Sequence, residues 1–228
     1  LSLATAVPPH VISQSDAASF ATSAFSGRFA EFDQVAGVFM TSGIRRRRAV
    51  RPIDWYMQRL GWPERSAAYV DGACALFIDA ARQALGKAGL KASEIDTVVT
   101  VSSTGITTPS LDARVAGEMG FKAGVERVPV FGLGCAGGVS GLSIAARLAQ
   151  SRPGVNVLLV AVETCTLSFR SNQLTKANVV ATALFGDGAA ALVLRADDNG
   201  VAEIESTAQY TWPDTLDIMG WSVDAEGL

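Results

Sequence analysis

The sequence lacks several features that mark whole classes of protein. Its 228 residues hold only three cysteines, Cys74, Cys135 and Cys165, with no C-x-x-C spacing. This argues against a disulfide framework and against a zinc or other metal site, and we expect a cytoplasmic protein in a reducing compartment. No apolar run approaches the roughly 18 residues of a membrane-spanning helix, so we expect no membrane association.

Charged residues are also scarce, at 18%, whereas hydrophobic residues make up 49% of the chain. This balance excludes a disordered chain and supplies a sizeable core. The net charge of −3 argues against a general nucleic-acid binder. Basic residues are nevertheless concentrated in residues 27–65, which hold eight arginines and four acidic residues. This local surplus suggests a small anion site rather than a surface for a polyanion.

Hydrophobic periodicity predicts helices over residues 64–87, 111–119 and 137–150, after short helical patterns in residues 15–60. Strands are predicted over residues 95–102, 126–131, 155–162, 188–195 and 201–210. Continuous apolar strands that alternate with helices indicate a parallel sheet covered on both faces, so the fold class is α/β. The last two strands are expected to add an antiparallel edge.

The segment VPVFGLGCAGGVSG (residues 128–141) places Cys135 between a predicted strand and a predicted helix. At a helix N-terminus, backbone N–H groups and the helix dipole lower the pKa of a thiol and favour the nucleophilic thiolate. Cys135 is therefore a candidate nucleophile that takes an acyl group as a thioester. The alternative is a small buried hydrophobic residue, the usual state of a free cysteine.

The same segment also matches a different template. Gly132, Gly134 and Gly137 spell G-x-G-x-x-G, and Glu163 ends the next predicted strand. This is the pattern of a dinucleotide site with its ribose-binding acid, which would indicate an NAD(P)-dependent oxidoreductase. Glu163 lies farther from the last glycine than this pattern normally has it, and a complete strand–helix unit precedes the motif.

Four segments in order resemble one known family. GCAGG (134–138) resembles the nucleophile loop of the thiolase superfamily, in particular of type III polyketide synthases of the chalcone synthase type. STGITTP (103–109), VETCTLSFR (162–170) and ALFGDGAAALVL (183–194) resemble further segments of that family, as do the opening LSLATAVPPH and SGIRRRR. The resemblance implies a thiolase-like layered αβαβα fold, of which this chain covers mainly the N-terminal half. We expect residues 1–205 to form that N-terminal domain and residues 206–228 to begin a C-terminal domain.

The resemblance also implies roles for individual residues. Cys135 matches the nucleophile, and Phe185 matches the aromatic gatekeeper between a coenzyme A tunnel and the active-site cavity. Thr108 matches a position that reaches the partner subunit's cavity. Positions that line the cavity are matched by Ser103, Cys165 and Ser168. Cationic positions that meet coenzyme A phosphates are matched by Arg45, Arg46 and Arg48.

The implied activity is decarboxylative Claisen condensation of an acyl-coenzyme A starter with malonyl-coenzyme A in a homodimer, without a cofactor. Cys165 stands where plant chalcone synthases carry threonine, which favours an aliphatic starter and pyrone or resorcinol-type products. The family also needs a histidine and an asparagine, but the only histidine here is His10, which matches no catalytic position. We expect these two residues beyond residue 228. Alternatives are a condensing enzyme like ketoacyl-acyl carrier protein synthase III and a non-catalytic half that binds coenzyme A esters.

Overall fold

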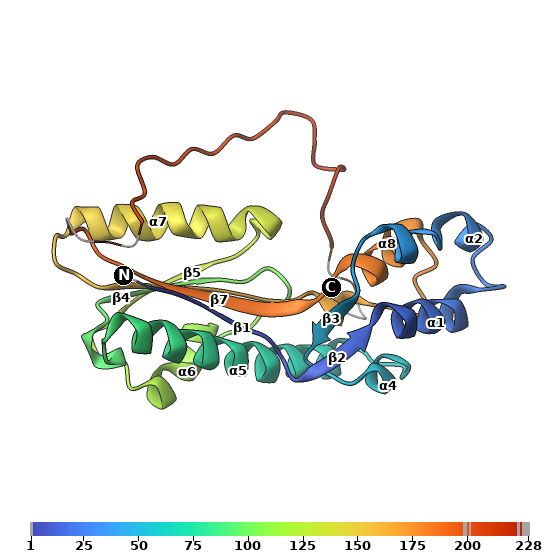
Figure 1. Cartoon of the computed structure of the whole chain (residues 1–228), viewed down its shortest axis with the longest axis horizontal. Coiled ribbons are helices and arrows are strands. Elements are labelled where there is room, and N and C mark those ends of the chain that lie inside the picture. Colours follow the sequence, from blue (N-terminus) through green and yellow to red (C-terminus); the bar gives the residue numbers. More distant parts are fainter. Residues whose placement is uncertain (1, 198–199, 201, 223, 225–228) are drawn as a thin grey trace.

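A five-stranded sheet forms the centre of the molecule (Figure 1). The structure is a computed structural model and describes residues 2–197, 200, 202–222 and 224. The strands lie in the order β1–β7–β6–β4–β5. Their bounds are β1 Ser2–Ala6, β4 Thr97–Val101, β5 Glu126–Val130, β6 Val157–Thr164 and β7 Asp187–Leu194.

The pairing confirms a parallel sheet with an antiparallel edge. Val99 of β4 lies opposite Val128 of β5 and Leu159 of β6, and both pairings are parallel. β7 pairs antiparallel with β6, and β1 pairs antiparallel with β7. The antiparallel edge therefore combines one predicted strand with the first residues of the chain, for which no strand is predicted.

Helices cover both faces of this sheet, as the sequence predicts (Figure 1). α7 (Gly137–Ser151) lies on one face, and α5 (Trp62–Ala88) and α6 (Leu111–Met119) lie on the other. Along β4, the buried Val98 belongs to the core beneath α5, whereas Val99 and Val101 belong to the core beneath α7. Successive side chains of a strand point to opposite faces, so one apolar run supplies both cores.

A smaller group of elements lies beside one end of the sheet (Figure 1). It contains an antiparallel ribbon of two strands and several short helices, where the sequence predicts helices only. Its members are β2 His10–Ser13, α1 Gln14–Phe25, α2 Phe32–Val35, α3 Val38–Thr41, β3 Arg46–Ala49, α4 Ile53–Tyr56 and α8 Lys176–Leu184. Three 3₁₀ turns complete the elements: η1 Ala92–Glu94, η2 Gly134–Ala136 and η3 Cys165–Ser168.

The strand predicted over residues 201–210 is wrong, because residues 202–210 take no regular structure. Among the residues that the structure describes, no strand pairs with this segment to accept its backbone hydrogen bonds. It crosses α7 instead, where Gln209 Nε2 donates to Ser140 Oγ and the hydroxyls of Ser143 and Thr207 lie 2.7 Å apart. The expected start of a C-terminal domain at residue 206 stays a prediction.

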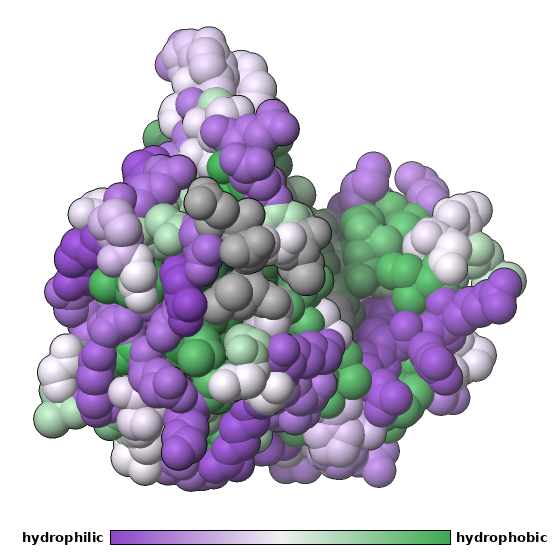
Figure 2. All heavy atoms as spheres, turned by 60° about the vertical axis from the view of Figure 1, so that its left-hand side comes forward, coloured by the Kyte–Doolittle hydropathy of each residue, from purple (hydrophilic) through white to green (hydrophobic). Residues whose placement is uncertain are grey.

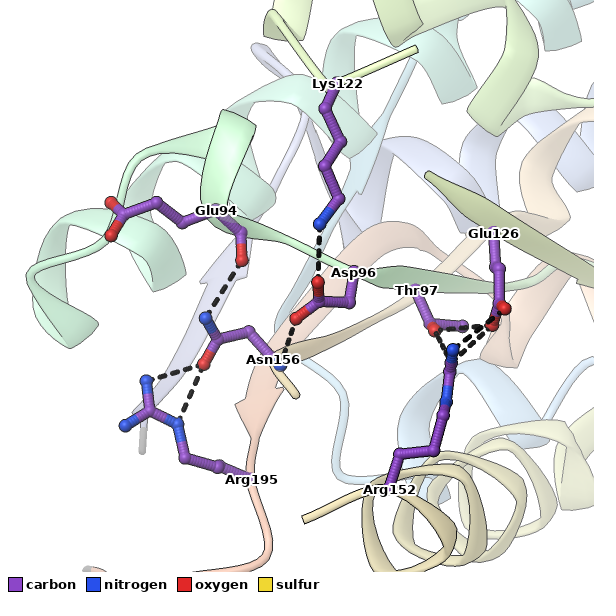
Figure 3. Close-up of polar contacts among 8 residues, drawn as sticks. All are labelled: Glu94, Asp96, Thr97, Lys122, Glu126, Arg152, Asn156 and Arg195. Atoms are coloured by element: carbon purple, nitrogen blue, oxygen red, sulfur yellow. Dashed lines mark hydrogen bonds and ion pairs between the residues drawn. The ribbon is translucent and has the colours of Figure 1, made fainter. Parts of the chain in front are cut away.

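Polar side chains connect the strands at the end where β4, β5 and β6 begin (Figure 3). Asp96 accepts the backbone N–H of Asn156 at 2.8 Å and a hydrogen bond from Lys122. Arg195, just after β7, donates to Asn156 Oδ1 at 2.7 and 2.9 Å. This end of the sheet comes forward in Figure 2, where hydrophilic side chains cover most of the surface. Among the described residues, no helix is both long and apolar enough to cross a bilayer.

Candidate active site

The candidate site lies at the opposite end of the sheet, where the three parallel strands finish. Because parallel strands share one direction, the residues that follow them meet at one edge. Ser103 follows β4, Cys135 follows β5 and Cys165 follows β6. The structure thus brings the ends of three strands together, with residues that are about 30 positions apart in succession along the chain.

Cys135 lies in η2, the single 3₁₀ turn that directly precedes α7. Its side chain is exposed. The chain enters this turn through Gly132 (φ +84°) and Gly134 (φ +51°), in the left-handed region that glycine occupies without a steric penalty. The turn places Cys135 just before the N-terminus of α7, where the positive end of the helix dipole favours an anion.

Ser103 connects the nucleophile turn to the end of β4. It is buried, and its Oγ accepts the backbone N–H of Gly134 at 3.2 Å. The backbone N–H of Ser103 is in turn held by Glu163 near the end of β6, at 2.9 and 3.0 Å from the two carboxylate oxygens. Burial raises the pKa of Glu163, and hydrogen bonds from Thr104 and Ser103 oppose that shift.

Cys165 lines a mostly apolar hollow at the end of the sheet where the parallel strands finish. Phe185 and Ser168 line the same hollow, so three of the predicted cavity residues meet there. Ser168 Oγ donates to the carbonyl of Cys165 at 2.8 Å, which stabilises the η3 turn. Burial, followed by the carboxylates of Glu163 and Asp187, raises the pKa of Cys165 to about 12. Cys165 therefore remains a neutral thiol near pH 7.

Asp187, the first residue of β7, holds the η3 turn in place. Its carboxylate accepts the backbone N–H and the hydroxyl of Thr166 at 2.8 and 2.6 Å. It also accepts the backbone N–H of Val50 at 2.8 Å. Tyr56, whose hydroxyl lies 2.6 Å from Thr166 Oγ1, adds a second polar contact to this turn and a wall to the hollow.

The four consecutive arginines divide into one buried residue and three outer ones. Arg45 and Arg46 are exposed, and the half-buried Arg48 donates to the carbonyl of Pro9 at 3.4 Å. Arg47 is buried and donates to Gln14 Oε1 and to carbonyls at the C-terminus of α8, including Ala183 at 2.8 Å. A cation at a helix C-terminus is favourable, so Arg47 stabilises the fold, whereas the other three arginines lie nearer the surface.

Two of the predicted substrate-binding positions, Ser103 and Thr108, do not line the hollow. Ser103 lies between the nucleophile turn and β6, as described above. Thr108 is exposed and precedes a cis peptide bond to Pro109; its carbonyl accepts from Arg114 at 3.3 Å. His10 lies in β2 opposite Ala49 of β3, so it pairs within the ribbon rather than at the strand ends that carry Cys135.

Comparison with known proteins decides the family. Residues 62–198 match the model of the N-terminal domain of chalcone and stilbene synthases. The chain belongs to the chalcone and stilbene synthase family. It is 38% identical to 1,3,6,8-tetrahydroxynaphthalene synthase of Streptomyces peucetius subsp. caesius, over 98% of this chain and 60% of that protein.

Solved type III polyketide synthases of this family share the fold. The crystal structure of 1,3,6,8-tetrahydroxynaphthalene synthase from Streptomyces coelicolor A3(2) matches with a TM-score of 0.93 and 30% identity, over 99% of this chain and 64% of that one. CsyB complexed with CoA-SH matches with a TM-score of 0.84 and 25% identity, over 100% and 65%. The chain thus spans less than two thirds of each of these proteins. The match confirms the thiolase-like α/β fold. It also confirms that this chain corresponds to the N-terminal part of that fold.

Chalcone and stilbene synthase membership does not support the dinucleotide interpretation of the glycine motif. Glu163, the ribose ligand in that interpretation, instead accepts hydrogen bonds from the backbone of Ser103 and the hydroxyl of Thr104. Sequence reasoning missed its true contacts, as it missed the separate position of Arg47. The one sequence signal for Glu163 is that it is an acidic residue at the end of a buried strand. Its partner, Ser103, can be identified only in the folded chain.

Proposed function

We propose that this chain carries the nucleophile of a type III polyketide synthase, and that Cys135 takes an acyl group from a coenzyme A thioester. The observation that carries the proposal is the exposed thiol of Cys135 at the N-terminus of α7, beside the ends of three parallel strands. Family membership supports the reaction class, and the position of Cys135 supports its proposed role as the nucleophile.

The reaction begins when the Cys135 thiolate attacks the carbonyl carbon of the starter thioester. Coenzyme A leaves as its thiolate, and the acyl group remains on the sulfur. Malonyl-coenzyme A then loses carbon dioxide, and the bonding electrons pass to an enolate. The enolate carbon attacks the Cys135 thioester, the cysteine thiolate leaves, and the chain has grown by two carbons. A histidine and an asparagine outside this chain are proposed to stabilise the enolate and the oxyanion.

The hollow beside Cys165 supports an aliphatic starter. Its walls combine Cys165, Phe169 and Phe185 with aliphatic side chains such as Ile12 and Ile53. A neutral thiol in place of a hydroxyl weakens the wall as a hydrogen-bond partner for a polar starter. We assign Phe185 the gatekeeper position because it is 39% exposed at the rim of this hollow. Pyrone or resorcinol-type products follow from an aliphatic starter in this proposal.

Coenzyme A is proposed to bind through the outer arginines. The guanidinium groups of Arg45, Arg46 and Arg48 suit phosphate oxygens, and Arg47 already has protein partners.

We also propose a homodimer, in which Thr108 faces the partner subunit. β5 is an edge strand of the sheet, and an unpaired strand edge favours pairing with another chain. Light scattering on the purified protein measures its molar mass in solution and so tests the homodimer.

Intact-mass spectrometry tests the nucleophile. The protein is incubated with a medium- or long-chain acyl-coenzyme A, and its mass is compared with that of Cys135→Ala and Cys165→Ala treated in the same way. We expect one acyl adduct on the wild-type chain and on Cys165→Ala, and none on Cys135→Ala. An adduct that survives in Cys135→Ala would overturn the assignment, and no adduct on any chain would leave a reversible coenzyme A ester-binding half.

A further inference from the structure

We propose that Glu163 is a positioning residue for the nucleophile turn, acting through Ser103 on Gly134 and so on Cys135. The proposal rests on the function proposed for Cys135. Glu163 does not touch the reacting sulfur in this structure. It holds the backbone of Ser103 at the end of β4, and Ser103 in turn binds the nucleophile turn at Gly134.

The contacts form a continuous path across three strand ends. Both carboxylate oxygens of Glu163 lie within 3.0 Å of the Ser103 backbone nitrogen, and Oε2 accepts the Thr104 hydroxyl at 2.7 Å. Thr104 Oγ1 accepts the backbone N–H of Thr164 at 2.8 Å, which closes the path back onto β6. Ser103 Oγ then accepts the N–H of Gly134 at 3.2 Å.

These hydrogen bonds restrain the turn at Gly134, whose residues pack little against the rest of the protein. Gly134 is in the left-handed region, and in this position a glycine has more conformational freedom than any other residue. Residues 131–136 are all exposed, so packing does little to hold them. The hydrogen bond to the buried Ser103 is therefore the side-chain contact that connects this turn to the end of β4 and helps to orient Cys135 before α7.

A carboxylate suits this task because it accepts several hydrogen bonds at once. Glu163 is half-buried and its pKa is raised by burial, so its place here costs free energy that the contacts with Ser103 and Thr104 offset. An ionised carboxylate near a thiolate also repels it, so the benefit to Cys135 must come from position rather than from charge.

Amide hydrogen exchange on the full chain, followed by NMR at Gly134, tests the proposal without any substrate. We compare wild type with Glu163→Ala, Glu163→Gln and Asp96→Asn. Asp96 is a matched control: it also accepts a backbone N–H at a strand end, but at the opposite end of the sheet (Figure 3). We expect exchange at Gly134 to rise about tenfold or more in Glu163→Ala and less than about threefold in Glu163→Gln, whose amide oxygen still accepts. Asp96→Asn should leave exchange at Gly134 unchanged relative to exchange in α7.

A chemical readout accompanies the exchange measurement. Iodoacetamide labels Cys135, assigned by peptide mapping, and we expect severalfold slower labelling in Glu163→Ala with recovery in Glu163→Gln. Ser103→Ala removes only the acceptor of the Gly134 N–H and should reproduce the local effect if Glu163→Ala does not fold. Equal exchange at Gly134 in Glu163→Ala and Asp96→Asn, or faster labelling in Glu163→Gln than in wild type, would overturn the proposal. Because no acyl transfer is measured, a failure of the proposed function leaves this result interpretable.

Discussion

At the scale of single residues, burial makes two cysteines at one sheet edge chemically different. Cys135 is exposed in the turn before α7, and Cys165 is half-buried beside the carboxylates of Glu163 and Asp187. The raised pKa of Cys165, about 12, keeps its thiol almost entirely protonated at pH 8.

Selective alkylation follows from this difference. At pH 8 we expect iodoacetamide to modify Cys135 at least about tenfold faster than Cys165, because only the thiolate reacts and Cys165 is both protonated and less accessible. Peptide mass mapping over time gives both rates in one sample. Comparable rates, with Cys135→Ala as the check on peptide assignment, would contradict the structural difference between the two sites.

At the scale of secondary-structure elements, close contact between α7 and β4 positions the nucleophile helix. A Cβ added at Gly141 would lie 2.5 Å from Val101 Cγ2, and one at Gly137 would lie 2.7 Å from Val101 Cγ1. Neither distance occurs between real side chains. These two glycines, one helical turn apart, allow α7 to lie against the sheet at the depth that places Cys135 at the strand ends.

The Gly141→Ala variant tests this contact. Alanine raises helix propensity by about 1 kcal/mol, but the forced shift of Val101 should cost more, and we expect a net loss of about 1–2 kcal/mol in the free energy of unfolding. Gly117→Ala in α6 is the matched control, because its Cβ would meet no atom within 4 Å. That variant should gain up to about 1 kcal/mol. Urea denaturation measures both, and a stabilised Gly141→Ala would show that α7 has room to move.

At the scale of the whole molecule, Asp187 joins three distant parts of the chain. Its carboxylate connects β7 with the segment after β3, through Val50, and with η3, through Thr166. Burial raises the pKa of Asp187 above its ordinary value of 3.8, and the hydrogen bonds from Thr166 and Val50 reduce that shift. The folded protein therefore favours the neutral carboxyl group more than the unfolded chain does.

The pH dependence of stability should report this group. A raised pKa contributes stability that is fully present below the unfolded value and is lost as the pH rises through the folded value. The free energy of unfolding of wild type minus that of Asp187→Asn should therefore fall as the pH rises from about 4 towards 7. Urea titrations of the two proteins at each pH give the difference, in which other titrating groups cancel. A constant difference would show that Asp187 has its ordinary pKa in the folded protein.

The sequence by itself determined the elements whose pattern is local. Apolar periodicity predicts α5, α6 and α7 and the strands β4 to β7 to within a few residues, because each element repeats its own buried face. The same reasoning places Cys135 at a turn from strand to helix. Resemblance added the family, and with it Phe185, Cys165 and Ser168, which share one hollow.

Only the tertiary structure decided which distant residues meet. Arg47 is buried on the carbonyl of Ala183, 136 positions away, and no local pattern separates it from its three neighbouring arginines. Glu163 holds Ser103 across 60 positions, and β1 rather than residues 202–210 pairs with β7. A strand needs a neighbour and a buried charge needs a partner, and both conditions are met between segments far apart in the chain. Local sequence carries the propensity of each element, whereas the partner of each polar group is set when the elements pack.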